Sequence, residues 1–263
     1  MRILLAAKHP PRGRRPIGGV QSWCATVGAE LARLGHEVVF WGPEWRFPVG
    51  SFDAGIVANV PFTRAVLPQC DRVLMVSHGI IPAEEPEGSV VAYTSEGVRD
   101  HWGGSGPVIR QPIDLDFWSP GDGGKYLTRF SYRRGLDFLP RLADRMGLRF
   151  RHVASLSQAE AREVLRSSAC VLATGRAALE AMACGVPVVI CDHRSAYQGP
   201  LMDPDTLGAM ARNYSGRGGV TPTPGNLAEA VQHAMGVGSL RAHVEAHHDA
   251  RKVTQQLLEL VTC

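Results

Sequence analysis

Short apolar runs alternate with amphipathic stretches along this 263-residue chain. The apolar run 2–7 has the length of a buried strand, and in residues 20–34 the apolar side chains recur at three- and four-residue spacing, as on one face of a helix. Gly35 ends that helix, and the apolar run 37–41 predicts a second strand. A strand, a helix and a strand in this order predict the first unit of a doubly wound parallel sheet.

The same alternation continues to the end of the chain. Further strands are predicted at 54–60, 72–76, 90–94, 126–130 and 149–153, and further helices at 135–146, 158–166, 203–212, 226–235 and 240–260. A glycine-rich stretch at 121–124 interrupts the pattern and indicates an interdomain linker. We therefore predict an α/β fold of two facing Rossmann-like domains, residues 1–119 and 120–263, with a cleft between them. The last helix can pack back on the N-terminal domain.

The most informative element covers residues 169–190. Its parts are, in order, a strand at 169–173, a turn at Thr174-Gly175, a helix at 176–184, a left-handed cap at Gly185 and a strand at 186–190. Almost all residues at 176–184 are of types that favour an α-helix. The element is a strand-to-helix turn of the kind that positions ligands in parallel sheets.

The predicted helix at 176–184 begins just after a glycine, so its first amides are available to a ligand. The amides of Arg176, Ala177 and Ala178 would carry partial positive charge there, which suits an anion. Glu180 lies one turn further along. It either contacts a ligand or merely complements the helix dipole.

Composition and charge fit a globular protein, with 44% hydrophobic residues, 20% charged residues and a net charge of +3. No apolar stretch is long enough to span a membrane, and the N-terminal run, which ends at Lys8, fits a strand better than a signal peptide. The six cysteines have no zinc-site spacing, and Cys170 and Cys184 lie in apolar contexts that favour the core. These features predict a reduced, cytoplasmic protein.

The cationic side chains are almost all arginines. Only Lys8, Lys125 and Lys252 are lysines among 28 cationic residues. A GC-rich genome accounts for most surface arginines, whereas a planar guanidinium also suits phosphate where its position supports that role.

A basic loop, Lys8-His-Pro-Pro-Arg-Gly-Arg-Arg-Pro16, follows the first strand. It is either a solvated loop or part of a site for an anionic acceptor such as DNA, RNA or an anionic glycan. In the second interpretation Lys8, Arg12, Arg14 and Arg15 bind the acceptor.

Two more positions follow strands where open α/β sheets bind ligands. Gly18 and Gly19 open the first helix and let the backbone approach a phosphate or a sugar, although tight packing explains them equally well. His78 follows the strand at 72–76 and is either a cleft residue or a turn histidine bonded to the backbone.

Four motifs occur in order along the chain. They are Ile17-Gly-Gly-Val-Gln21 with Leu34-Gly-His-Glu-Val38, the run Val108-Ile-Arg-Gln-Pro-Ile-Asp-Leu-Asp-Phe-Trp-Ser-Pro120, Arg129 with Arg134 and Gly135, and Leu179-Glu-Ala-Met-Ala-Cys-Gly-Val-Pro-Val-Val189. Together they resemble the GT-B glycosyltransferases and, within these, the retaining family 4, over nearly the whole chain. The small phage transferases that decorate hydroxymethylated bases in DNA share this fold, so the resemblance extends to a compact DNA-modifying member.

The resemblance implies a UDP- or GDP-linked sugar as co-substrate and transfer of a hexose or pentose to an acceptor hydroxyl, with retention. Fixed donors and cations would stabilise the departing diphosphate. These groups are the amides at Gly18, Gly19, Ala177 and Ala178, the turn Thr174-Gly175-Arg176, and the side chains of Arg129 and of Arg134 or Arg133.

The resemblance also implies three further roles. Glu180 would accept the ribose hydroxyls, the base would lie against the loop that starts at Val153, and His78 would lie beside the donor sugar and the attacking hydroxyl. The catalytic set would then be His78, Arg129 and Arg134. No tightly bound cofactor and no metal are expected, and no carboxylate cluster in the sequence suggests a metal.

One feature departs from the family pattern. The family commonly has Glu-x7-Glu, but Leu172 stands eight residues before Glu180, inside a predicted strand. The missing first Glu would alter the sugar-binding corner. It also raises the alternative of a catalytically degenerate module that binds sugar nucleotides. A nucleotide-sugar epimerase of the same fold is a further alternative.

Overall fold

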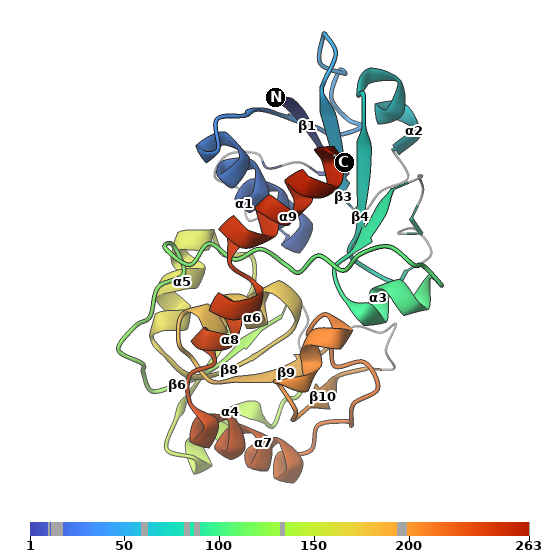
Figure 1. The fold of residues 1–263 in the computed structure, drawn as a ribbon. Helices are drawn as coiled ribbons and strands as arrows, with labels where there is room; N and C mark the ends of the chain where they lie inside the picture. The colour runs from blue at the N-terminus through green and yellow to red at the C-terminus, as the bar shows by residue number, and fades with distance from the viewer. Residues whose placement is uncertain are drawn as a thin grey trace. The chain divides into compact units, whose positions relative to one another are not determined.

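The computed structural model describes residues 1–9, 11, 18–58, 63–81, 85–86, 90–131, 135–193 and 199–262. The chain forms two compact units, which can be located in Figure 1 by the colours that mark residue number. Unit 1 contains Met1–Asp114 and His248–Cys263, and unit 2 contains Leu115–His247. The glycine-rich stretch 121–124 therefore lies inside unit 2.

Unit 1 is built on a five-stranded parallel sheet. Its strands are β1 (Arg2–Ala7), β2 (Glu37–Trp41), β3 (Ala54–Ala58), β4 (Val73–Ser77) and β5 (Val91–Tyr93), in the spatial order β2-β1-β3-β4-β5. This order reverses direction beside β1, as in doubly wound sheets. The predicted parallel sheet is confirmed.

Both faces of the unit 1 sheet are buried. On β1, Ile3 and Leu5 belong to the apolar cluster beneath α1 (Gly19–Arg33), while Leu4 and Ala6 belong to the cluster on the other face. The C-terminal helix α9 (Ala250–Thr262) lies beside α1 and shares its cluster (Figure 1). Within the residues that the structure describes, unit 1 also has three short helical segments: α2 (Thr63–Val66), the 3-10 turn η1 (Leu67–Gln69) and α3 (Glu96–His101).

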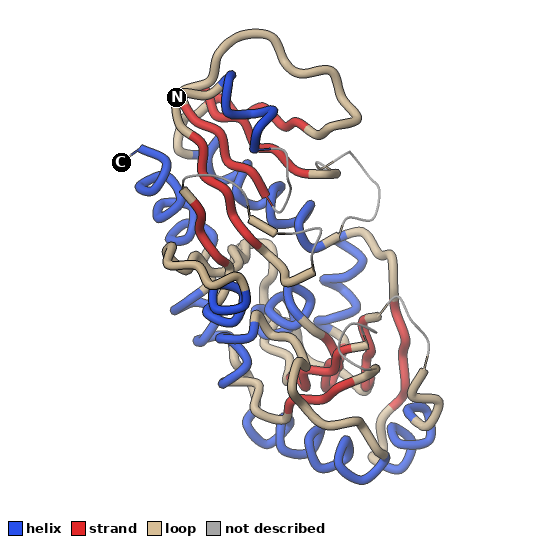
Figure 2. Tube along the Cα trace, turned by 90° about the vertical axis from the view of Figure 1, so that its right-hand side faces the viewer, coloured by secondary structure: helices blue, strands red, loops and turns tan. Residues whose placement is uncertain are grey.

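Unit 2 has its own five-stranded sheet, with helices around it (Figure 2). Its strands are β6 (Tyr126–Phe130), β7 (Arg149–Val153), β8 (Ser168–Ala173), β9 (Val188–Asp192) and β10 (Leu201–Asp203), in the order β10-β9-β8-β6-β7. Only the edge strand β10 is antiparallel to its neighbour. The helices are α4 (Leu139–Arg145), α5 (Gln158–Arg166), α6 (Gly175–Ala183), the 3-10 helix η4 (Gly208–Arg212), α7 (Pro224–Val237) and α8 (Arg241–His247).

The sequence-based elements differ from the structure at several places. The helix predicted at 203–212 is wrong, because 201–203 pairs with β9 as β10 and only a 3-10 turn follows. The helix predicted at 135–146 begins later, at Leu139. The short helix α3 was not predicted, although Ser95 caps it by accepting the Val98 amide.

The single helix predicted at 240–260 is also wrong, because His248 and Asp249 separate α8 from α9. His248 is buried, and its Nδ1 donates to the Gln111 carbonyl at 2.9 Å. Its own carbonyl accepts the Ile113 amide at 2.7 Å. Because these bonds tie the backbone of 248 to the strand-like segment 111–113, the helix cannot continue through it. No helix of the described residues is long and apolar enough to cross a membrane.

Candidate functional site

The N-terminus of α6 lies directly after the carboxyl end of β8, as predicted. Thr174 is extended, and Gly175 has a φ of +54°, which few other residues adopt. The Gly175 amide donates to the Tyr214 carbonyl at 2.8 Å. Among the described residues the Thr174 side chain makes no capping hydrogen bond, so the backbone of Tyr214 takes the place of a side-chain cap.

The helix starts one residue earlier than the predicted start at Arg176. In a helix that begins at Gly175, the Ala178 amide is the first to find its acceptor inside the helix. The expectation that Ala178 offers its amide to a ligand is therefore wrong. The amides of Arg176 and Ala177 point out along the helix axis. Gly185 has a φ of +75° and ends the helix as predicted.

Arg176 and Glu180 form an ion pair one turn apart on α6. The Nε of Arg176 lies 2.9 Å from the Oε1 of Glu180, and the two side chains are 6% and 13% exposed. Burial raises the pKa of Glu180, while the charge and hydrogen bond of Arg176 act in the opposite direction. A carboxylate held in this way is suited to accept hydrogen bonds from hydroxyl groups.

Arg129 is buried near the carboxyl end of β6. Its Nη1 donates to the Gly135 carbonyl, across the residues 132–134 that include Arg133 and Arg134. Burial lowers the pKa of Arg129, and the neighbouring Cys191 and Asp137 act against that shift. An arginine remains cationic in this setting, so unit 2 holds a fixed positive charge at the carboxyl end of its sheet, where open α/β sheets generally bind ligands. Arg133 and Arg134 lie outside the described residues.

Val153 ends β7, beside Phe130 of β6. Its carbonyl accepts the Ser131 amide at 3.1 Å, and the neighbouring Ser155 has a φ of +56°. The carboxyl ends of β6, β7 and β8 thus bring Arg129, Val153 and Gly175 to one edge of the unit 2 sheet. These are the residues for which the sequence predicts a donor-binding role.

In unit 1 the corresponding edge holds Lys8 and His78. Lys8 follows β1 and is exposed, whereas His78 follows β4 and is 9% exposed. The His78 ring meets the Trp23 ring edge-on, with centroids 5.0 Å apart. Trp102 donates its indole N–H to the Gly79 carbonyl at 2.8 Å, which fixes the backbone beside His78.

The first helix begins at the predicted glycine pair. Gly18 is the N-cap of α1, and its amide donates to the Oε1 of Gln21 at 2.6 Å. The Gly18 amide is therefore already hydrogen-bonded, whereas the sequence predicted that it contacts a ligand. At Gly19 no described atom lies within 4 Å of the place of a Cβ. The acceptor residues predicted at Arg12, Arg14 and Arg15 lie outside the described residues.

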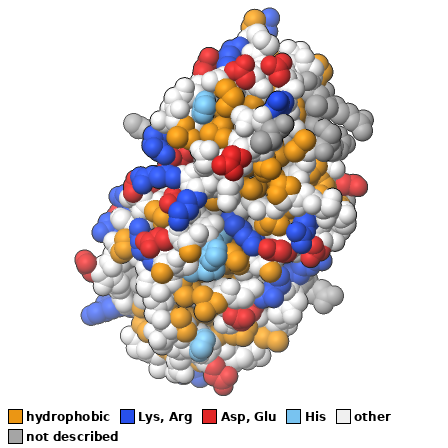
Figure 3. All heavy atoms as spheres, viewed as in Figure 1, with side chains coloured by type: hydrophobic (Ala, Val, Ile, Leu, Met, Phe, Trp, Pro, Cys, Tyr) orange, Lys and Arg blue, Asp and Glu red, His pale blue; other side chains and the backbone are white. Residues whose placement is uncertain are grey.

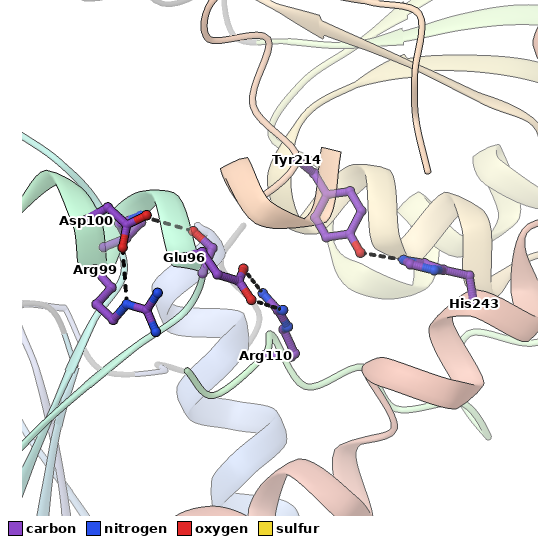
Figure 4. A network of polar contacts seen from close by, with 8 residues as sticks. Glu96, Arg99, Asp100, Arg110, Tyr214 and His243 are labelled. Atoms are coloured by element: carbon purple, nitrogen blue, oxygen red, sulfur yellow. Dashed lines mark hydrogen bonds and ion pairs between the residues drawn. The ribbon is translucent and has the colours of Figure 1, made fainter. Parts of the chain in front are cut away.

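The polar pairs that the sequence did not predict include two that join distant parts of the chain. Arg110 binds Glu96 through both oxygens, at 2.7 and 2.5 Å, and this hydrogen bonding lowers the pKa of Glu96 (Figure 4). In unit 2 the Tyr214 hydroxyl lies 2.7 Å from the Nε2 of His243 (Figure 4). No local pattern connects these partners, because each pair is far apart along the chain.

Among the described residues, buried cysteines belong to the core and the carboxylates form no metal site. The thiols of Cys170 and Cys184 are buried, and burial raises the pKa of Cys170 to about 12, so both behave as core residues as predicted. The described part of the chain has no group of three or more His, Cys, Asp or Glu side chains that could hold a metal ion. Basic and acidic side chains are interspersed on the face drawn in Figure 3.

Comparisons with known proteins identify the fold. No protein-family model matches the sequence, and no curated protein matches it significantly. Among solved structures, AviGT4, a glycosyltransferase involved in avilamycin A biosynthesis, matches with a TM-score of 0.67 at 15% identity, over 100% of this chain and 97% of that one. Sucrose-phosphate synthase from Thermosynechococcus elongatus matches with a TM-score of 0.61 at 13% identity, over 99% and 98%.

A third similar structure is an alpha-glucosyltransferase in complex with UDP and a 13-mer DNA containing an HMU base. It matches with a TM-score of 0.58 at 13% identity, over 100% of both chains. At these identities the likeness shows the fold alone. The chain has the GT-B glycosyltransferase fold, with two Rossmann-like sheets, and the resemblance read from its motifs is confirmed at that level.

Proposed function

We propose that this protein is a retaining glycosyltransferase that moves a hexose or pentose from a UDP- or GDP-linked sugar to an acceptor hydroxyl. The observation that carries the proposal is the edge of the unit 2 sheet. There the N-terminus of α6, the buried Arg129 and the buried Arg176–Glu180 pair occur together in a chain whose whole length has the GT-B fold. A helix N-terminus and a fixed cation suit a diphosphate, and a fixed carboxylate suits ribose hydroxyls.

The proposed roles follow from these groups. The amides of Arg176 and Ala177 and the guanidinium of Arg129 bind the diphosphate, together with Arg134 or Arg133. Glu180 accepts the ribose hydroxyls, and the backbone near Val153 contacts the base. His78 and the Gly19 amide act on the sugar and phosphate from unit 1.

In the reaction, the bond from the anomeric carbon to the β-phosphate oxygen breaks, and the diphosphate leaves with the electron pair. The acceptor oxygen bonds to the anomeric carbon on the face that the diphosphate leaves, which retains the configuration, and its proton passes to the departing β-phosphate oxygen. The charge that develops on the leaving group is the one that Arg129 and the helix amides would stabilise. We propose that the reaction needs no metal and no tightly bound cofactor.

For the acceptor we propose hydroxymethylated DNA. Support comes from the likeness to an alpha-glucosyltransferase bound to UDP and DNA, and from the exposed Lys8 at the start of the basic loop. The likeness to AviGT4 makes a small-molecule acceptor the competing outcome. Binding to DNA through arginines and lysines should weaken steeply as salt rises, because bound cations are released from the phosphates.

The experiment incubates the protein with a panel of UDP- and GDP-sugars, with and without hydroxymethylated DNA, and analyses the products by mass spectrometry. Transfer or slow hydrolysis with release of the nucleoside diphosphate supports the transferase. An isomerised nucleotide sugar would indicate the epimerase instead, and binding without turnover would indicate the degenerate module. Salt-insensitive or absent DNA binding would exclude the DNA acceptor while leaving the transferase intact.

A further inference from the structure

Tyr214 occupies an unusual place in unit 2. It is 1% exposed, and both it and its neighbour Asn213 have left-handed backbone conformations, with φ values of +55° and +54°. Asn tolerates this conformation, but for a bulky residue such as Tyr it is a genuine outlier. Such a conformation persists only where the surrounding contacts hold it, and it often occurs beside functional sites.

Two contacts of Tyr214 explain what holds it. Its hydroxyl lies 2.7 Å from the Nε2 of His243 on α8, as Figure 4 shows. Its carbonyl accepts the Gly175 amide at 2.8 Å. One buried residue therefore connects α8 with the first amide of α6.

The turn is also fixed from its other side. The Tyr214 amide donates to the Ala209 carbonyl at 2.9 Å, and the Asn213 amide donates to the Met210 carbonyl at 3.1 Å. Arg212 forms an ion pair with Asp203 of β10. Because the backbone at 209–213 is held in this way, the Tyr214 carbonyl has a defined direction toward α6.

We propose that Tyr214 and His243 are positioning residues for the diphosphate-binding end of α6. The His243–Tyr214 hydrogen bond holds residue 214 in its left-handed conformation, and the Tyr214 carbonyl then fixes where α6 begins. That start determines the direction of the Arg176 and Ala177 amides, and hence their fit to a diphosphate. This inference rests on the proposed function, since it names residues that act on the donor site without touching the donor.

Tyr214→Phe is the direct test, because it removes the hydroxyl and keeps the ring and the carbonyl. His243→Phe removes the same hydrogen bond by replacing its other partner. The double variant also lacks only this one bond. Tyr126→Phe is the matched control, since Tyr126 lies at the opposite, amino end of the unit 2 sheet. All four variants and the wild type are compared by amide hydrogen exchange at Gly175 and by calorimetric titration with UDP.

We expect the Gly175 amide to exchange about tenfold faster and UDP to bind about tenfold more weakly in Tyr214→Phe, the effect of losing one net hydrogen bond. His243→Phe and the double variant should show the same changes rather than their sum. Tyr126→Phe should match the wild type.

Unchanged Gly175 exchange in Tyr214→Phe would overturn the proposal, as would faster exchange with unchanged UDP affinity. Additive effects in the double variant would also overturn it, because they would show that the two residues act independently. If the wild type binds no nucleoside diphosphate, the proposed function fails, whereas the exchange at Gly175 still decides whether Tyr214 holds the start of α6.

Discussion

The Nε of Arg176 binds the Oε1 of Glu180 at 2.9 Å on the first two turns of α6, with the two side chains 6% and 13% exposed. The arginine directly follows the turn Thr174-Gly175, and the first Glu of the Glu-x7-Glu pattern is replaced in this chain by Leu172 of β8. A carboxyl group this buried tends to take up a proton unless a cation lies beside it. The pair therefore keeps Glu180 available as a hydrogen-bond acceptor.

Replacing Arg176 by Met should make stability strongly dependent on pH. Burial raises the pKa of Glu180 in the folded protein, so the folded state binds this proton more tightly than the unfolded chain does. The contribution of Glu180 to stability is then greatest at low pH and falls as pH rises from about 4.3, the ordinary Glu value, through the raised folded value. Without Arg176 that folded pKa rises further, so the loss extends to higher pH.

We expect Arg176→Met to lower the free energy of unfolding by about 3–5 kcal/mol at pH 8 and by clearly less at pH 5. Urea unfolding at the two pH values measures the difference. The variant Arg176→Met with Glu180→Gln serves as the control and should lose the pH dependence. An equal destabilisation at both pH values would contradict a role for Arg176 in keeping Glu180 ionised.

Replacing Arg129 by Met should lower kcat strongly while the protein remains folded. The guanidinium is fixed at the carboxyl end of β6, where it would meet charge that develops in the transition state. Loss of one such donor typically lowers kcat about 10²–10³-fold. Release of UDP from UDP-glucose measures this, with the exposed Arg141→Met as the control, which should keep wild-type kcat.

Arg129→Lys separates charge from geometry. Lysine keeps the charge but lacks the planar fork that reaches the Gly135 carbonyl, so it should restore only part of the rate. A full rate in Arg129→Met would remove this residue from the catalytic set.

Replacing Arg241 should change the stability of the protein and leave the proposed donor site intact. Its guanidinium donates to the carbonyls of Leu115, Trp118 and Ala183, at 3.2, 2.9 and 2.5 Å, and pairs with Glu245. These bonds fasten the segment after Asp114 to the end of α6 and to α8. Arg241→Met should lower the free energy of unfolding by roughly 2–4 kcal/mol, because it leaves partly buried carbonyls without a donor.

Thermal and urea unfolding measure the change, with the exposed Arg145→Met as the control. If Arg241→Met lowers the free energy of unfolding by less than Arg145→Met does, water satisfies these carbonyls as well as Arg241 does.

The sequence predicted the parts of this fold that local patterns determine. Buried strands such as β1 and β6 and the left-handed stop at Gly185 follow from apolar runs and from glycine, and their bounds were found to within a residue or two. The break at His248 could not be found in this way, because a buried hydrogen bond to the distant Gln111 causes it. The edge strand β10 was missed for a similar reason, since its pairing with β9 overrides a weak helical pattern.

The candidate site divides in the same manner. The turn at Thr174-Gly175 and the cation at Arg129 could be predicted because the motifs name them. The four-residue spacing of Arg176 and Glu180 can be seen in the sequence, but their ion pair cannot. No sequence pattern connects Tyr214 with Gly175, which it contacts through its carbonyl. Backbone carbonyls leave no signature in a sequence, so a cap of this kind becomes visible only in the structure.

Replacing Glu180 tests whether the edge of the unit 2 sheet binds a nucleoside-diphosphate sugar. Calorimetric titration of the wild type, Glu180→Ala and the exposed control Glu229→Gln with UDP measures it, with circular dichroism to verify folding. We predict that the wild type and Glu229→Gln bind UDP equally, and that Glu180→Ala binds it at least 10-fold more weakly, since it loses a charged hydrogen-bond acceptor worth about 1.5–3 kcal/mol. Wild-type affinity in a folded Glu180→Ala protein, or no affinity of the wild type for UDP or GDP, would rule out a donor site that uses Glu180.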